Sequence, residues 1–309
     1  MADTNMRKAY GDTLLALGKE NPDIVVLEAD LGKSTMTHAF QEAYPERYFE
    51  MGIAEANMVS CAAGLAQCGK IPFVNSFAVF ASGRTYDQIR QTVSIGNLNV
   101  KICGSSSGLS DYADGATHQD IEDLAIMRVI PNMHVFCPAD AYETASCTRY
   151  MTEIAGPCYM RTSRAEVPPV TPKDEPFSPV PRVLREGKDV TVFACGYMNS
   201  VALEAAEKLA GSVSVRVVNV STLKPLDEET VRRLAADVKC VVTCEEHSVI
   251  GGLGSAIAQA LARDPKPMRF VGVEDRFGSS GRNYNQLIQK YHLTSDDVSD
   301  AVQALFEGR

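Results

Sequence analysis

The 309-residue chain is long enough for two domains, and its 45% hydrophobic and 22% charged residues are typical of a globular protein. A net charge of −9 at pH 7 and a pI of about 5.2 argue against nucleic acid as the main partner, because a phosphate backbone binds to basic surfaces. No apolar run reaches the roughly 18 residues that a membrane-spanning helix needs, so no membrane partner is expected.

The N-terminal segment "MADTNMRKAYGD" (1–12) lacks the apolar stretch of a secretory signal peptide. The nine cysteines are scattered through apolar runs, and none of them forms a C-x-x-C pair. Such cysteines are typical of reduced structural thiols rather than of disulfides or metal ligands. We therefore expect a cytoplasmic protein with no metal site in this chain.

Strand patterns alternate with helix patterns through the first half of the chain. Continuous β-branched and apolar runs predict buried strands at residues 23–30, 71–77, 98–105 and 133–140. Amphipathic or small-residue segments predict helices at residues 6–21, 55–69, 84–96 and 140–154. This alternation is typical of a doubly wound parallel sheet.

A change in composition follows at "AEVPPVTPKDEPFSPVP" (165–181), which contains six prolines and cannot form a helix. The strand and helix patterns then resume up to the C-terminus. We therefore expect an α/β protein of two doubly wound domains. These are placed at residues 1–164 and 183–309, and an extended proline-rich linker at residues 165–182 joins them.

Glu55 is the one charged residue in the small and apolar run "GIAEANMVSCAAGLA" (52–66). Its sequence neighbours offer no counter-charge, so burial there would raise its pKa. A carboxyl group that shares a proton near neutral pH suits general acid–base chemistry. The alternative is a surface glutamate in the first turn of a helix.

Two aromatic residues, Phe77 and Phe80, lie at and just beyond the end of a predicted strand. An α/β sheet opens its ligand crevice at such strand ends, although both rings could also belong to the core. The polar loop "DYADGATHQD" (111–120) follows the next strand, and in it His118 could move a proton near neutral pH. The alternative is a solvated turn that caps a helix beginning near Asp120.

Arg161 and Arg164, in "YMRTSRAEV" (159–167), end another strand and could grip an anionic group, or they could be surface charges. The segment "EEHSVIGGLGSAI" (245–257) lacks the full G-x-G-x-x-G dinucleotide pattern. We interpret it as a tight turn that lets a helix pack on the second sheet.

Taken together, these residues resemble the C-terminal half of a transketolase over essentially the whole chain. The segments "GIAEANM", "SFAVFASGRTYDQIR", "DGATHQDIEDLAIMRVIPNMHVFCPAD", "SRAE" and "EEHSVIGGLGSAI" occur in family order. The resemblance implies a pyrimidine-binding domain, a linker and a smaller transketolase C-terminal-like domain. It also implies dependence on thiamine diphosphate, which acts as an electron sink.

The resemblance assigns cofactor contacts to three side chains. Glu55 would reach the aminopyrimidine ring and favour its imino tautomer, whose nitrogen removes a proton from the thiazolium. Phe80 would stack on the pyrimidine ring, and Phe77 would lie beside it.

The resemblance also assigns the substrate end of the site. His118 matches a histidine that contacts the donor sugar near its reacting carbons, and Asp114 matches an acid that reads a donor hydroxyl. Arg7, Ser34 and Arg164 match residues that hold the sugar phosphate.

One position departs from the family pattern: Ser106 stands where the family usually has a further phosphate-binding histidine. The ketose donor and the aldose acceptor therefore stay open. The family's G-D-G…N-N motif, which holds the diphosphate and its Mg²⁺ or Ca²⁺, is also missing from this sequence. We therefore expect a separate N-terminal transketolase subunit, an α₂β₂ assembly, and a contact surface on the small-residue helix after Glu55.

The predicted function is that of a transketolase subunit that moves a two-carbon ketol unit between sugar phosphates and is active only with its partner. One alternative is the β subunit of a 2-oxo-acid dehydrogenase-like enzyme. Another is a deoxyxylulose-phosphate-synthase-like enzyme. A non-catalytic regulatory or scaffold subunit is the alternative from a different class.

Overall fold

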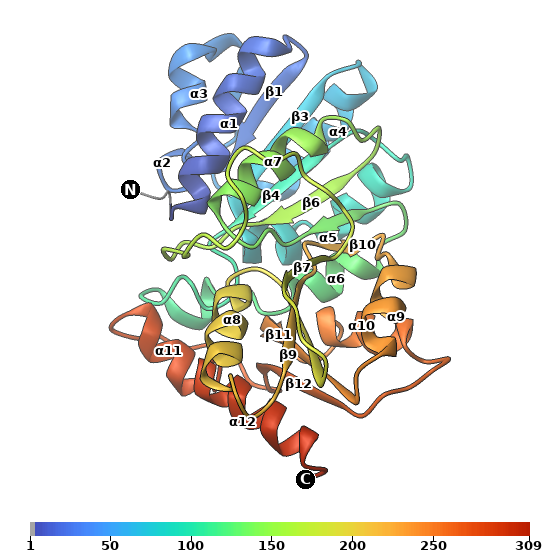
Figure 1. The fold of residues 1–309 in the computed structure, drawn as a ribbon. Helices are drawn as coiled ribbons and strands as arrows, with labels where there is room; N and C mark the ends of the chain where they lie inside the picture. Colours follow the sequence, from blue (N-terminus) through green and yellow to red (C-terminus); the bar gives the residue numbers. More distant parts are fainter. Residues whose placement is uncertain (1–3) are drawn as a thin grey trace.

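The computed structural model describes residues 4–309, which form two α/β domains, each built around one sheet. In Figure 1 the first half of the chain, blue to green, lies above the second half, yellow to red. Within residues 4–309, no helix combines the length and the apolar character needed to cross a bilayer.

The first sheet confirms the predicted strand–helix alternation. Among the described residues it has seven strands in the order β10-β5-β6-β4-β3-β1-β2, and only β10 runs antiparallel to its neighbour. The strands are β1 (Ile24–Glu28), β2 (Tyr48–Glu50), β3 (Ile71–Phe77), β4 (Lys101–Ser105), β5 (His134–Phe136), β6 (Cys158–Arg161) and β10 (Thr222–Lys224).

The alternation of side chains along β1 explains how both faces of this sheet are covered. Ile24 and Val26 pack on one face, and Val25 and Leu27 pack on the other. The helices of the first half are α1 (Met6–Glu20), α2 (Gly32–Thr35), α3 (His38–Ala43), α4 (Glu55–Gln67), α6 (Asp123–Val129) and α7 (Ala141–Met151). Helices α1, α3 and α7 cover the first face, and α4 and α6 cover the second.

The helix predicted at residues 84–96 is the main local difference from the sequence interpretation. A π-helical turn, η2 (Phe80–Arg84), a short α5 (Tyr86–Gln88) and a second π-helical segment, η3 (Ile89–Ser94), replace one regular helix. π-Helical turns are rare and are often found at functional sites. Here η2 places Arg84 above the ring of Phe80, at 4.3 Å from the ring centroid.

The second sheet has the order β12-β11-β8-β9-β7. Its strands are β7 (Arg182–Arg185), β8 (Val190–Ala194), β9 (Val215–Asn219), β11 (Cys240–Ser248) and β12 (Met268–Val273). The helices are α8 (Met198–Lys208), α9 (Glu228–Ala236), α10 (Leu253–Ala260), α11 (Tyr284–Lys290) and α12 (Ser295–Phe306). Helices α8, α11 and α12 lie on one side of this sheet, and α9 and α10 lie on the other (Figure 1).

The two halves are joined by more than the linker. Strand β10 pairs with β5, so a segment beyond residue 183 extends the first sheet. One apolar cluster contains Val135 from the first half together with Val218 and Leu253 from the second. The proline-rich segment has neither helix nor strand, as predicted, and it is fixed in place because Asp140 accepts hydrogen bonds from the amides of residues 170 and 171.

Candidate active site

The predicted site residues gather at the carboxyl ends of parallel strands in the first sheet. Ser34 follows β1, Glu55 follows β2, Phe77 ends β3, His118 lies in the loop after β4, and Arg164 follows β6. Ligands of open α/β sheets bind at this edge, because the loops after neighbouring strands meet there. Phe77 and Phe80 therefore lie at the edge of the sheet where the sequence placed them.

Glu55 begins α4 and is 2% exposed, but it is not without a counter-charge. The Nη1 atom of Arg84 lies 2.8 Å from each carboxylate oxygen of Glu55. The expectation of an uncompensated carboxylate is therefore wrong. The sequence neighbours of Glu55 carry no positive charge, and the π-helical turn supplies one from a segment 29 residues away.

An aromatic wall stands beside this ion pair. The rings of Phe77 and Phe80 are stacked with centroids 6.2 Å apart. The imidazole of His118 meets both rings edge-on, at 5.4 Å from Phe80 and 6.2 Å from Phe77. Its Nδ1 atom lies 2.9 Å from the hydroxyl of Thr117, which fixes the orientation of the ring. We call Glu55, Phe77, Phe80, Arg84 and His118 the aromatic–carboxylate cluster.

The aromatic–carboxylate cluster fits a planar ring that carries N–H donors. The guanidinium group of Arg84 shows this, because it is planar, donates to both oxygens of Glu55 and lies over the face of Phe80. A ring bound to Glu55 and stacked on Phe80 would take the place of Arg84. The Arg84 side chain is 47% exposed, so it can turn into solvent without entering the core.

A second group, Arg7, Ser34, Asp111, Asp114 and Arg164, forms the arginine cluster. Arg7 donates from Nη1 to the carbonyl oxygen of Ser34 at 2.9 Å, and from Nη2 to the carbonyl oxygen of Arg164 at 3.5 Å. Arg164 donates to Asp111 at 2.8 Å and lies 4.0 Å from Asp114. The structure thus brings together the three residues predicted to hold an anion, with Asp111 as an ion-pair partner that the sequence interpretation did not assign.

Two observations indicate that the arginine cluster has capacity for an anion. The Nε atom of Arg7 is buried and has no hydrogen-bond partner. Burial, together with the nearby charge of Arg164, lowers the pKa of Arg7. An anion placed between the two guanidinium groups would satisfy the free donor and reduce the repulsion between the two charges.

One loop connects the two clusters. Asp114, which is 48% exposed, faces Arg164, whereas the half-buried His118 touches the aromatic wall. Only a single 3₁₀ turn, η4 (Gly115–Thr117), separates them in the described chain. The two clusters are therefore the two ends of one site, with a ring-binding end and an anion-binding end.

Two further positions, Arg161 and Ser106, do not take part in the arginine cluster. Arg161 does not grip a ligand: its side chain is 5% exposed, and its Nε atom lies 3.1 Å from the carboxylate of Asp123. The hydroxyl of Ser106 is buried and has no hydrogen-bond partner among the described residues. The capping alternative for the polar loop is partly right, because Asp120 accepts from the amide of Asp123 at 2.9 Å, and α6 begins at Asp123 rather than at Asp120.

The turn before α10 has the structural role that the sequence suggested. Glu245 accepts from the amides of Leu253 and Gly254 at 2.6 and 2.8 Å, and Gly251 has a positive φ of 83°. This carboxylate satisfies free donors at the start of the helix. Among residues 4–309, no group of three or more His, Cys, Asp or Glu side chains is arranged to hold a metal ion.

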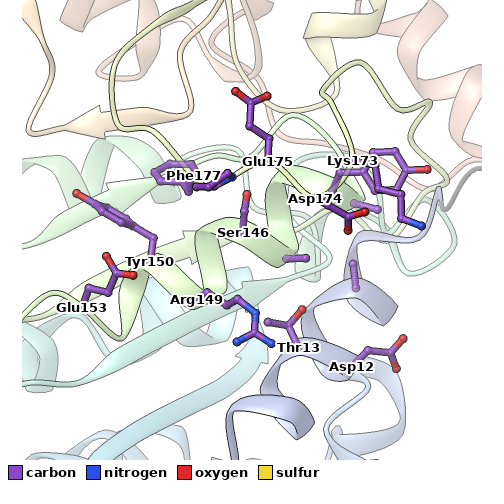
Figure 2. Close-up of a pocket in the computed structure, with 15 residues that line it drawn as sticks. Asp12, Thr13, Ser146, Arg149, Tyr150, Glu153, Lys173, Asp174, Glu175 and Phe177 are labelled. Carbon is purple, nitrogen blue, oxygen red and sulfur yellow. The ribbon is translucent and has the colours of Figure 1, made fainter. Parts of the chain in front are cut away.

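A cavity of about 850 Å³ lies on the other face of the first sheet, between α1, α7 and residues 173–177. Figure 2 shows Arg149 and Tyr150 of α7 lining it together with Asp12 and Phe177. None of the predicted site residues lines this cavity. The predicted site therefore lies apart from this cavity, at the carboxyl edge of the first sheet.

Arg84 and Asp111 are the functional candidates that sequence reasoning missed. Arg84 is four residues after Phe80, a spacing that puts two side chains on one face of a helical turn, and this was an available signal. Asp111 belongs to the polar loop, but nothing local distinguishes it from Asp114 as the partner of Arg164.

Two family models match the chain. The model described as transketolase, pyrimidine binding domain, matches residues 2–169, and the model described as transketolase, C-terminal domain, matches residues 181–298. The chain belongs to the transketolase family. Within that family it is a transferase subunit that carries the pyrimidine-binding and C-terminal domains, and transketolases depend on thiamine diphosphate.

Relatives of this transketolase chain include other subunit-length proteins. A transketolase C-terminal section of Methanocaldococcus jannaschii is 41% identical, over 96% of this chain and 95% of the relative. A 6-deoxy-6-sulfo-D-fructose transketolase subunit of a Clostridium species is 42% identical, over 98% of this chain and 94% of the relative.

A solved structure described as a split gene transketolase, inactive β₄ tetramer, has a TM-score of 0.89 and 48% identity and covers 99% of each chain. Together with the relatives, it identifies this chain as the C-terminal subunit of a split transketolase. These findings fit the transketolase interpretation rather than the dehydrogenase, synthase or scaffold alternatives.

Proposed function

We propose that this subunit moves a two-carbon ketol unit between anionic sugars, with thiamine diphosphate bound at the aromatic–carboxylate cluster. The observation that carries this proposal is Glu55: a carboxylate 2% exposed that already binds a planar N–H donor lying over Phe80. When bound, the cofactor supplies a carbon nucleophile and an electron sink, which protein side chains lack.

The residues of the two clusters have distinct roles in this proposal. Glu55 would hold a proton against a ring nitrogen in a site that the partner subunit shields from water, and Phe80, with Phe77 behind it, would orient the ring by stacking. His118, at the edge of Phe80, is placed to donate to an oxygen of the donor sugar near its reacting carbons.

At the other end of the site, Arg7 and Arg164 bind the anionic end of the sugar. Ser34 belongs to the short helix α2, which supports Arg7, because the carbonyl oxygen of Ser34 accepts from that guanidinium group. Asp114, 4.0 Å from Arg164 and 48% exposed, can accept a hydrogen bond from a sugar hydroxyl.

The partner subunit is proposed to cover α4. The exposed face of this helix carries small or uncharged side chains at helical spacing, namely Asn57, Ser60, Cys61 and Gly64. Next to Glu55, Ile53 is 76% exposed, and a partner would bury it and close the cofactor site. We expect this N-terminal subunit to supply the diphosphate ligands and the Mg²⁺ or Ca²⁺, in an α₂β₂ assembly.

The identity of the anionic group is part of the proposal. One relative is named for a sulfonated ketose, so phosphate and sulfonate are both compatible with a pair of guanidinium groups. A cytoplasmic location, expected from the nine free thiols, stays a prediction.

The test is Glu55→Gln in the complex with the partner subunit, assayed with phosphorylated and sulfonated ketose donors. We expect a loss of about 10²- to 10⁴-fold in turnover, because the amide cannot hold the ring proton. Glu42→Gln, an exposed glutamate of α3, is the matched control and should leave turnover unchanged. Full activity of the Glu55 variant, turnover of ketoses by this chain alone, or turnover of pyruvate-like acids instead would contradict the proposal.

A further inference from the structure

The loop that carries Asp114 and His118 is closed at its base. We call residues 108–120 the site loop. The amide of Gly108 donates to the carbonyl oxygen of Asp120 at 2.8 Å, which joins the two ends. Between these ends the backbone hydrogen bonds run from Gly115 to Asp111 and from His118 and Gln119 to Gly115, all of them in or beside the 3₁₀ turn η4.

A segment of the C-terminal domain, residues 277–281, lies along this loop, and we call it the clamp segment. The amide of Gly281 donates to the carbonyl oxygen of Tyr112 at 2.7 Å. A Cβ atom on Gly115 would lie 2.4 Å from the hydroxyl of Ser280 and 2.9 Å from its amide nitrogen, so the two backbones are in close contact. In Figure 1 this part of the chain, just before α11, lies beside the green loop.

Gln119 is the side chain that joins the site loop to the clamp segment. It is 4% exposed, and its Nε2 atom lies within hydrogen-bond distance of three carbonyl oxygens. Two belong to the site loop, those of Leu109 at 3.4 Å and Asp111 at 3.1 Å. The third, that of Ser279 at 3.1 Å, belongs to the clamp segment. One amide group therefore holds two turns of the loop against the C-terminal domain.

The clamp segment is in turn held by α11 and the residue after it. The hydroxyl of Tyr291 donates to the carbonyl oxygen of Phe277 at 2.9 Å and lies 3.1 Å from the hydroxyl of Ser279. Lys290 donates to the same Ser279 hydroxyl at 2.7 Å. None of Lys290, Tyr291 and Ser279 belongs to either cluster of the site.

We infer that the C-terminal domain positions the site loop for the donor sugar, with Gln119 and Tyr291 as the positioning residues. This inference rests on the proposed function, because it assigns the sugar-binding loop to that reaction. A chain of contacts from Tyr291 through the clamp segment to Gln119 sets where Asp114 and His118 stand. The C-terminal domain thereby gains a role in donor affinity without touching the donor.

The first test is hydrogen exchange of this chain by itself, which requires neither partner nor activity. Gln119→Met keeps the side-chain volume and removes the amide, so the backbone amides of residues 111–118 should exchange about tenfold faster. Gln303→Met, an exposed glutamine of α12, is the matched control and should change nothing in this segment. Unchanged exchange in the Gln119 variant would overturn the inference.

Tyr291→Phe removes a single hydroxyl and tests the same path from the far side. It should speed exchange in residues 277–281 and in 111–118, and its effect should be less than additive with that of Gln119→Met, because both changes open one contact chain. Additive effects, or exchange that changes only next to Tyr291, would overturn the inference. This variant also serves if the Gln119 variant does not fold.

In the complex with the partner, both variants should raise the KM for the ketose donor about five- to tenfold while the affinity for thiamine diphosphate stays unchanged. A merely destabilised protein would lose both together, and that outcome would contradict a positioning role. Absence of turnover in the unsubstituted complex would contradict the proposed function, while the exchange results would still decide whether the clamp holds the loop.

Discussion

Two ion pairs with a buried carboxylate show how differently the same chemistry is used in this molecule. Asp123 is 0% exposed and its partner Arg161 is 5% exposed, so both charges are enclosed between the two sheets. Glu55 is 2% exposed, but its partner Arg84 is 47% exposed. The side chain of Arg161 is enclosed on all sides, whereas the side chain of Arg84 can leave the carboxylate and enter water.

The difference lies in what surrounds each arginine. Arg161 also donates to the carbonyl oxygens of Asp120 and Glu246, and thus ties the first sheet to β11 of the second. Arg84 contacts the Glu55 carboxylate and the Phe80 ring, and both are groups that a ligand could use instead. Exposure of the arginine, more than burial of the carboxylate, distinguishes the candidate site from the structural pair.

The largest expected effect is on the enclosed pair. Arg161→Met should lower the free energy of unfolding by about 3–5 kcal/mol, because it leaves buried carboxylates without their counter-charge. Urea denaturation of this chain measures the change. A loss below about 1 kcal/mol, the value typical of exposed pairs, would remove the distinction between the two ion pairs.

Arg164 lies three residues further along and is half exposed, so its loss should affect binding more than stability. Arg164→Gln should raise the KM for a phosphorylated or sulfonated donor about 10- to 100-fold, the value of a charge-assisted contact, in the complex with the partner. A ketose without the anionic group should be unaffected. Arg182→Gln, which removes an ion pair with Glu175, is the control. An equal rise in KM for charged and uncharged donors would show that Arg164 does not bind the anionic group of the donor.

The pH dependence of stability is the next test of the enclosed region. Burial raises the pKa of Glu28, Asp120 and Glu246 to about 7 in each case. A carboxyl group with a raised pKa stabilises the fold fully below its unfolded value, near 4, and this stabilisation is lost as the pH rises through 7.

The free energy of unfolding should therefore carry a component that falls between pH 5 and pH 7, on the order of 2 kcal/mol per group. Glu246→Gln should flatten this slope, whereas the control Glu42→Gln should not. Urea denaturation across this range measures it, and a slope that the Glu246 variant leaves unchanged would contradict the assignment.

The smallest effect is expected at the open pair. Arg84→Met should cost less folding free energy than Arg161→Met, because the Arg84 side chain is 47% exposed and water can reach the Glu55 carboxylate once the arginine is gone. If Arg84 occupies the place of the cofactor ring, the same variant should bind thiamine diphosphate at least as tightly as the unsubstituted complex, as titration calorimetry can measure. Much weaker binding would show that Arg84 holds the cofactor directly.

Much of the fold followed from local patterns. The β-branched runs around Val26 and Val74 predicted buried parallel strands, and the small-residue run after Glu55 predicted α4, because side-chain periodicity and burial are properties of a short segment. The π-helical turn at Phe80–Arg84 was not predictable in the same way, since its extra residue per turn is stabilised by tertiary contacts.

The sequence by itself determined which chemical groups follow most of the strands: two aromatic rings at the end of β3, a histidine loop after β4 and an arginine after β6, whereas the short β2 before Glu55 was not predicted. It did so because the order of residues along a strand–loop–helix unit is local information. Only the tertiary structure decided that Arg84 faces Glu55, that Arg161 is enclosed while Arg164 is open, and that the clamp segment meets the site loop some 160 residues away. These contacts join distant segments, and their partners are selected by packing and charge pairing in three dimensions.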